Sequence, residues 1–449
     1  MSTMEKHDMT QGKILLPLVS FTIPLVLGNL FQLTYNAADS VIVGKYVGEQ
    51  ALAAVGTSTP IMNIAILLIS GMCMGASVLM SSQYGAKDYD TLSRQISTTM
   101  LAGCGFSVVF SLLMLLLANP VLRLIRVPET AIPEAAAYLR IIFMGLIFTF
   151  MYNFLANTMR ALGDSKTPLY FLVTSAFLNI FGDLFFVVVL RWGVAGSAIA
   201  TVCSEGLCCL LCGIYIKKKI PLLCLGKKWW VFDKSLLGKT VSYGSTSAMQ
   251  QVCLQLGKLI IQSVVNTQGV AVMAAFTAVN RVDDFAYTPQ QNIGHAMTTF
   301  LAQNKGAGHK ERMKKGFQTG LLIELVYSIG LFCVIWGLAP QIMTLFAEDG
   351  DAQVVSLGIS YLHLISWMYI LPGLTNGVQG FFRGIGDLKV TLYSTFMNMF
   401  GRVVAVFVMI RLLQMEFASL AWANMVGWIV MLLFEVPLLV KSMRNGECG

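Results

Sequence analysis

Long apolar segments separated by short polar loops recur along the whole 449-residue chain. Each segment reaches the roughly 20 residues that a helix needs to cross a bilayer. The strict alternation of apolar and polar residues typical of lipid-spanning strands is missing, and helices satisfy their backbone hydrogen bonds internally. The pattern therefore predicts an all-α integral membrane protein with twelve transmembrane helices, near residues 14–43, 51–82, 95–117, 135–158, 168–190, 194–216, 240–264, 270–302, 317–338, 353–381, 390–410 and 417–440.

Composition supports this interpretation, since 56% of the residues are hydrophobic and only 12% are charged. The net charge of +8 arises mostly from lysines and arginines in loops that would share one side of the membrane. The positive-inside rule then places both termini in the cytoplasm of a multi-pass protein of the plasma membrane. The polar first residues predict no cleaved signal peptide. The expected partners are the lipid bilayer and a small molecule, with no nucleic acid.

The chain also contains an internal repeat. RALGDSKTPLY, which starts at Arg160, returns as RGIGDLKVTLY from Arg383, with six of eleven positions identical, and two further segments recur at nearly the same spacing. This periodicity indicates a duplication of about half the chain. Six spans per half give a parallel repeat, an arrangement typical of transporters whose halves rock around a shared site. We predict an amino-terminal six-helix lobe at 1–216, a cytoplasmic linker at 217–239 and a carboxyl-terminal six-helix lobe at 240–449.

The first span carries a polar stripe, because Asn29, Gln32, Asn36 and Asp39 follow one another at helical spacing with Tyr35 beside them. Asp39 stands out, since an ionised carboxylate within lipid is far costlier than an amide. A hydrated position near the end of the helix is the simpler explanation for Asp39. We favour a functional role, facing a cavity.

The fifth span provides a second carboxylate, Asp183, one helical turn after Asn179. A desolvated carboxylate close to another acid can take up and release a proton near neutral pH. The same oxygen atoms, with an amide and a hydroxyl, could instead bind Na⁺. The pattern predicts a coupling-ion site for H⁺ or Na⁺, and no other metal or cofactor.

A comparison of the two halves suggests that they differ at this site. Asn179-Ile-Phe-Gly-Asp183 aligns with Asn398-Met-Phe-Gly-Arg402 at an offset of 219 residues, so an acid in the first half is replaced by a base in the second. We therefore expect proton or cation chemistry to belong to the first half.

Other polar residues within spans are candidates for lining a substrate cavity. Hydrogen bonds between helices explain Asn153 equally well, and Arg281 could neutralise Asp284 three residues later. Cys209 and Cys212 form a CxxC within an apolar helix, where helix packing is the better explanation. The predicted cavity residues are Gln32, Tyr35, Asn36, Asn153 and Asn157 in the first half and Gln251, Gln255, Lys258, Asp284 and Arg402 in the second.

Together, the segments YNAADSVIVGKYVG, SQYGAKD, MRALGDSKTP, GVAGSAIAT and QNKGAGHKERMKKG resemble the MATE (multidrug and toxic compound extrusion) family over nearly the whole chain. The resemblance implies a V-shaped fold of two six-helix lobes and exchange of drugs for H⁺ or Na⁺. It assigns Asp39, Asn179, Asp183 and Thr201 to the amino-lobe cation site, with Tyr35 and Asn157 nearby. Many relatives carry acids in the seventh and tenth spans, but this chain has glutamines and no tenth-span acid there. Coupling through the amino lobe, as in DinF-like members, is therefore expected.

We expect a secondary active antiporter that exports amphipathic organic compounds by alternating access and acts as a monomer. A flippase for a lipid-linked substrate is the alternative within the same superfamily, but its expected mark, a strongly basic cavity, is not matched by the acidic amino lobe. A membrane enzyme would need a cluster of catalytic groups, whereas the four histidines are dispersed. A channel would conduct ions without substrate counterflow.

Overall fold

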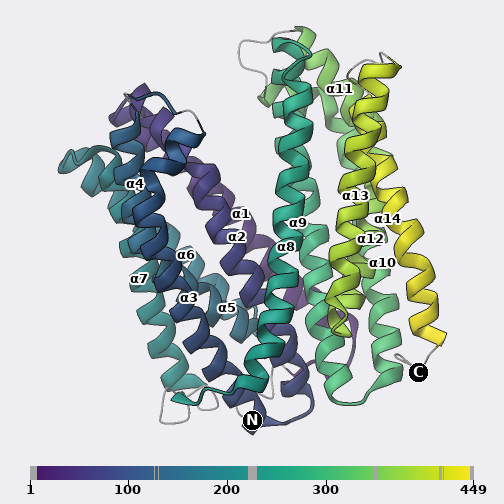
Figure 1. Ribbon diagram of the computed structural model, residues 1–449. Coiled ribbons are helices and arrows are strands. Elements are labelled where there is room, and N and C mark those ends of the chain that lie inside the picture. The colour runs from purple at the N-terminus through teal and green to yellow at the C-terminus, as the bar shows by residue number, and fades with distance from the viewer. Residues whose placement is uncertain are drawn as a thin grey trace. The chain divides into compact units, whose positions relative to one another are not determined.

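The structure is a computed structural model that describes residues 8–125, 127–129, 131–220, 230–346, 352–413, 417 and 419–444. These residues are almost entirely helical, without a strand, and the helices within each half run roughly alongside one another (Figure 1). The first half contains α1 Leu15–Tyr46, α2 Glu49–Gly85, α3 Tyr89–Leu124, α4 Ile132–Met144, α5 Leu146–Ala161, α6 Lys166–Asp183, the π-helical segment η2 Leu184–Val189, and α7 Gly193–Lys219. The second contains α8 Lys234–Val265, α9 Val270–Gly306, α10 Lys310–Phe346, α11 Ala352–Ser366, the 3₁₀ segment η6 Trp367–Tyr369, α12 Ile370–Gly384, α13 Leu388–Phe407, the π-helical η7 Val408–Leu412, and α14 Ser419–Arg444.

Within the described residues, nine helices are long and apolar enough to cross a membrane. The bent pair α4 and α5, which meet at 47°, raises this number to ten. The two remaining predicted spans, the seventh and eighth, correspond to α8 and α9. These helices have the same length as the others but carry many polar residues. Each predicted span therefore has a helix at its place, and the fourth and tenth spans are broken.

The chain divides into two compact units, which are described separately. The amino unit contains residues Met1–Asp8 and Ile23–Ala248, and the carboxyl unit contains Met9–Thr22 and Met249–Gly449. These boundaries differ from the predicted 216 and 240 in two ways, because the first residues of α8 belong to the amino unit and Met9–Thr22 belongs to the carboxyl unit. Part of the predicted linker, residues 221–229 with Trp229, lies outside the described residues.

Close packing explains why the start of α8 belongs to the amino unit. A Cβ atom added to Gly71 would clash with the backbone of Ala248, and one added to Gly75 would clash with that of Tyr243. Glycine therefore lets the backbones of α2 and α8 approach each other closely. Nearby, Gln95 of α3 donates a 2.5 Å hydrogen bond to Thr240 of α8.

The segment before α1 is held in the carboxyl unit by one arginine of α10. The guanidinium of Arg312 donates to the carbonyl oxygens of Met9, Gln11 and Gly12 at 2.7–3.1 Å. Backbone carbonyls outside a helix lack the partners that a helix provides. The guanidinium group has several N–H donors and can satisfy several such carbonyls at once.

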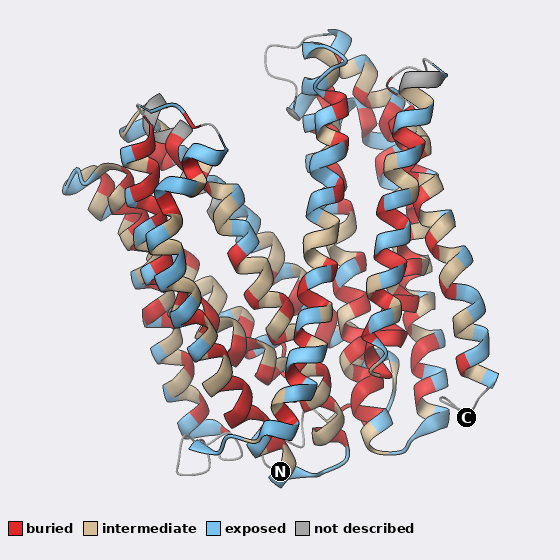
Figure 2. Ribbon diagram, viewed as in Figure 1, coloured by how far each residue is buried: buried red, intermediate tan, exposed pale blue. Residues whose placement is uncertain are grey.

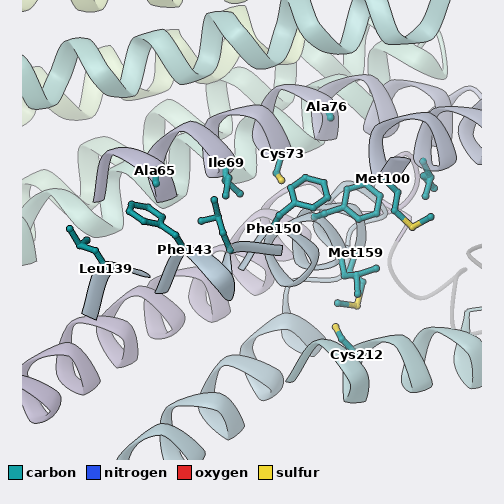
Figure 3. Packing of buried hydrophobic residues seen from close by; sticks show 14 of the residues in the cluster. Ala65, Ile69, Cys73, Ala76, Met100, Leu139, Phe143, Phe150, Met159 and Cys212 are labelled. Carbon is teal, nitrogen blue, oxygen red and sulfur yellow. The ribbon is translucent and has the colours of Figure 1, made fainter. Parts of the chain in front are cut away.

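In each unit the buried residues follow the helix faces that meet one another, and exposed residues cover the outer faces (Figure 2). Figure 3 shows part of the amino-unit core, where Ile69 and Cys73 of α2 face Phe143 of α4 and Phe150 of α5. Large apolar side chains such as Leu116, Phe181 and Leu433 remain more than two-thirds exposed. Such surfaces are typical of helices that face lipid.

The repeat is visible in the backbone. Gly163 and Gly386, the glycines of the two repeated loops, have φ angles of 89° and 85°. Gly48 and Gly269, which precede α2 and α9, have φ angles of 114° and 104°. Only glycine adopts such conformations readily, so both halves use the same residue to make the same turn.

Candidate functional site

The amino-unit site depends on close packing between α6 and α7. A Cβ on Gly182 would lie 2.9 Å from Ala200, and one on Gly196 would lie 3.0 Å from the backbone of Phe186. Small residues thus let the two helices approach, as is common between membrane helices. The polar residues one turn from these contacts are brought within hydrogen-bonding distance.

Three of the predicted polar positions are connected there through one additional serine. Asn179 of α6 donates to the hydroxyl of Thr201 of α7 at 3.1 Å, and Thr201 donates to the carbonyl of Ser197 at 3.1 Å. Ser197 in turn donates to a carboxylate oxygen of Asp39 at 2.7 Å. The structure therefore brings the predicted residues of α1, α6 and α7 together, and adds Ser197.

Asp183 lies next to Asp39, with the two carboxyl groups adjacent to each other. The Asp183 side chain is fully buried, and within the described residues neither of its oxygens accepts a hydrogen bond from a donor group. Two adjacent carboxylates in a low-dielectric interior strongly disfavour double ionisation. Among the described residues, Ser197 is the one hydroxyl donor to Asp39, so this oxygen-rich cluster contains few groups that offset the charge of an ionised carboxylate.

Sequence reasoning missed a third carboxylate in this region. Glu205 lies on α7 one turn after Thr201, and its Oε2 accepts a 2.5 Å hydrogen bond from Thr149 of α5. Thr149, Thr201 and Glu205 line a small pocket that also borders the break between α4 and α5. The spacing Ser197, Thr201, Glu205 places all three on one helix face, which was an available signal.

The remaining candidate residues of the amino unit differ in their contacts. Tyr35 lies near Asp39 and Glu205, and its hydroxyl interacts with Gln32. Asn153 and Asn157 donate to backbone carbonyls of their own helix at 2.9 Å, rather than to another helix or to the carboxylates. The side chain of the fifth candidate, Asn36, lies outside the described residues.

In the carboxyl unit, Asp284 pairs with Lys258 at 3.3 Å. The suggested pairing of Asp284 with Arg281 is therefore wrong, because the long side chain of Lys258 reaches Asp284 from the neighbouring helix α8. Gln251 and Gln255 are half-buried and exposed, respectively. The role of these two glutamines in a cavity stays a prediction.

The expectation that proton or cation chemistry belongs to the first half stays a prediction, but the carboxyl unit also encloses acids. Three carboxylates of the carboxyl unit are buried: Asp283 at 5% exposure, Glu324 at 1% and Glu435 at 0%. Glu435 lies near Arg383 and Ser394. Isolated acids in apolar segments show no periodic pattern, so the sequence did not indicate which of them would be enclosed.

Asp283 is the centre of a polar cluster. Tyr369 donates to one of its oxygens at 2.5 Å and Tyr361 to the other at 3.3 Å. Asn424 of α14 donates to the Tyr361 hydroxyl at 2.8 Å, and Arg402 lies close enough to attract the carboxylate. The predicted Arg402 therefore lies beside a buried acid, which a carboxylate–guanidinium attraction stabilises.

The proposed pairing of Asp183 with Arg402 does not fit the helical register. The π-helical segments begin at Leu184 and Val408, 224 residues apart, and the repeated loops before them are offset by 223. At an offset of 223, Arg402 corresponds to Asn179. The four-residue shift that the pairing needs is absent, because the starts of α6 and α13 and of the π-helical segments after them stay within one residue of the 223-residue offset.

Comparison with known proteins identifies the fold and the family. The family model described as MatE matches residues 24–185 and again 247–409, so the two matches begin 223 residues apart. The chain is 32% identical over 392 residues to a protein of Bacillus subtilis named probable multidrug resistance protein YpnP, which covers 87% of this chain and 86% of that protein. The chain belongs to the MATE family.

A second B. subtilis relative, probable multidrug resistance protein YoeA, is 29% identical and covers 85% of this MATE chain and 82% of its own length. A solved structure described as MATE in complex with MaL6 matches with a TM-score of 0.91, 22% identity and 98% coverage of both chains. The predicted two-repeat, all-helical MATE fold is therefore confirmed. The protein is a multi-pass membrane transporter of the multidrug efflux family, and it is not an enzyme.

Proposed function

We propose that this MATE protein is a secondary active antiporter that exports amphipathic organic compounds in exchange for H⁺ or Na⁺. The observation that carries the proposal is the adjacent pair of a partly buried Asp39 and a fully buried Asp183, to which Ser197 supplies the one hydrogen-bond donor group among the described residues. Such a pair binds a positive ion in order to balance its charge. Asn179 and Thr201 add neutral oxygen atoms, and the Asn179 carbonyl oxygen has no partner within the described residues.

The coupling mechanism follows from the effect of the ion on this pair. An ion drives a transport cycle only when it binds one conformation better than another. Ion binding neutralises Asp39 and Asp183 and allows α1 to repack against α6 and α7. Pro24 lies within α1, where its missing N–H interrupts the helical hydrogen bonds and provides a place to bend.

The substrate class is inferred from the relatives, which are named as multidrug resistance proteins. We place the protein in the plasma membrane as a monomer, and its loop charges support a cytoplasmic position for both termini. The predicted substrate-facing residues of both units stay part of this proposal. Nothing in the comparisons favours the flippase alternative.

The test is transport by the purified full-length protein in proteoliposomes with imposed pH and Na⁺ gradients. The expected result is that efflux of a cationic dye follows one gradient in the wild type and neither gradient in Asp39→Asn or Asp183→Asn. Asp88→Asn is the matched control, since Asp88 caps α3 by accepting from the Thr91 N–H at 3.1 Å and asparagine caps equally well.

Unchanged ion-driven efflux in both cluster variants would contradict coupling through the amino unit. Movement of a lipid-linked sugar across the same vesicles, without dye efflux, would instead establish the flippase. A comparison of the pH gradient with the Na⁺ gradient identifies the coupling ion.

A further inference from the structure

The tenth span of the chain, which lies in the carboxyl unit, is broken at a polar position. α11 ends at Ser366, three residues of 3₁₀ helix follow, and Pro372 then lies in the first turn of α12. The backbone carbonyl of Tyr369 at this break accepts a hydrogen bond from Gln290 of α9 at 2.8 Å, and the Ser328 hydroxyl of α10 lies 3.3 Å away. Broken helices with side chains on their free carbonyls commonly mark ion sites in transporters.

Glu324 lies one turn before Ser328 on α10 and is buried, with 1% of its surface exposed. Within the described residues, neither of its carboxylate oxygens has a hydrogen-bond partner. The hydroxyl of Ser328 does not donate to this carboxylate, because it donates to the backbone carbonyl of Glu324 at 2.7 Å. A buried, ionised carboxylate without donors is strongly unfavourable.

Gly373 shows that Glu324 shares a small space with this break. A Cβ atom added to Gly373 would lie 2.8 Å from the Ser328 hydroxyl, 3.2 Å from the Gln290 amide nitrogen and 3.4 Å from Oε2 of Glu324. Three polar atoms from α9 and α10 therefore surround one point beside α12, and glycine leaves that point free. A methyl group would fill it.

The orientation of the Gln290 amide determines which ion fits. Its nitrogen must face the Tyr369 carbonyl, since a carbonyl only accepts, and it also donates to Ser328 at 3.1 Å. The amide N–H groups thus lie at the shared space and would repel a metal cation there. The side-chain carbonyl oxygen of Gln290, in contrast, has no partner among the described residues, so an acceptor is free on the same amide.

The titratable groups around Glu324 are few. Tyr327 on its own helix interacts with it, and the Tyr327 hydroxyl donates to the carbonyl of Ala286 on α9 at 3.1 Å. Tyr369 of η6 contributes its backbone carbonyl, and α12 contributes Gly373. Within the described part of the chain, no charged side chain from α9, α11, η6 or α12 pairs with Glu324.

We propose that Glu324 is a proton-binding site of the carboxyl unit, separate from the Asp39 and Asp183 pair. The proton balances the buried charge and converts one carboxylate oxygen into a donor for this acceptor-rich pocket. Tyr369 links the surroundings of this site to a second acid, because its backbone carbonyl accepts from Gln290 while its hydroxyl donates to Asp283.

The test is pH-difference infrared spectroscopy of the full-length protein in lipid nanodiscs. A protonated carboxylic acid gives a carbonyl stretching band that an ionised carboxylate lacks. We expect Glu324→Gln to lose one such band. Gly373→Ala, which keeps Glu324 but fills the shared space, should shift the same band, whereas Gly330→Ala on α10 should leave it unchanged because a Cβ there meets open space.

The proposal is overturned if Glu324→Gln and the wild type give the same bands, or if Gly373→Ala leaves the spectrum unchanged. If Glu324→Gln does not fold, the band shift expected for Gly373→Ala tests whether Glu324 binds a proton. A wild-type band that disappears when Na⁺ replaces K⁺ would overturn proton binding in favour of sodium. Asp183→Asn removes a different band, so the result for Glu324 does not depend on the proposed antiport through the amino unit.

Discussion

The two units have polar residues at equivalent positions of the repeat, but their acids lie in different surroundings. At the repeat offset of 223, Tyr138 corresponds to Tyr361 and Thr201 to Asn424, and both members of each pair lie near a buried acid. In the amino unit two carboxylates lie side by side with few donors. In the carboxyl unit, Asp283 accepts from two tyrosine hydroxyls.

This difference decides what each acid can do. A carboxylate that already accepts strong hydrogen bonds is stabilised within the protein and gains little from an external ion. A pair of adjacent carboxylates with few donors is balanced only when an ion arrives. One scaffold can therefore hold a hydrogen-bonded acid such as Asp283 at one place and an acid pair with few donors at another.

The largest expected effect separates Asp183 from Asp283. Asp183→Asn should reduce gradient-driven dye efflux in proteoliposomes by about tenfold or more, equivalent to roughly 1.4 kcal/mol, because it removes half of the ion-binding pair. Asp283→Asn should keep gradient dependence in the protein that folds, and should lower its thermal stability. Equal loss of coupling in both variants would contradict the different roles of Asp183 and Asp283.

Removal of one donor should reveal the structural role of Asp283. Tyr369→Phe leaves a buried carboxylate oxygen without its hydrogen bond, which costs about 1–3 kcal/mol of stability. Thermal unfolding in detergent would measure this loss. Tyr138→Phe is the comparison variant, because its hydroxyl makes only a 4.0 Å contact with the sulfur of Met62. A similar loss of stability in both variants would argue against a special role for Tyr369.

A smaller effect should test the neutral ligands of the amino-unit cluster. Thr201→Val removes the hydroxyl that accepts from Asn179, and a hydrogen bond of about 0.5–1.5 kcal/mol corresponds to roughly a two- to tenfold weaker ion dependence. Thr201→Ser should preserve the wild-type value. The readout is the ion concentration that gives half-maximal efflux, and an unchanged value in the valine variant would remove Thr201 from the site.

The smallest effect is expected at the pair formed by Lys258 and Asp284. Both side chains are about half exposed, at 54% and 55%, so the ion pair should contribute less than about 1 kcal/mol to stability. Lys258→Ala should leave the unfolding temperature nearly unchanged. A large drop would show that this pair is shielded from solvent in the intact protein and belongs to the set of buried acids.

The sequence allowed much of the fold to be predicted, because hydrophobic segment length and the repeat depend on local composition. It also predicted the meeting of Asp39, Asn179, Asp183 and Thr201, where helical spacing agreed with the family resemblance. Helical spacing shows which residues share a face but not which helices meet. For this reason it missed Glu205 and Glu324, whose surroundings come from distant helices, and assigned Asp284 the wrong partner.

The π-helical segments that follow α6 and α13 say something about ancestry. Both begin at the same place in their halves, immediately after Asp183 and Phe407. A π-helical turn contains an additional residue relative to an α-helical turn and is rare, so two independent insertions at equivalent positions are a poor explanation. A single insertion in an ancestral half that was later duplicated accounts for both turns with one event. On this explanation the irregular turn is older than the difference between the halves.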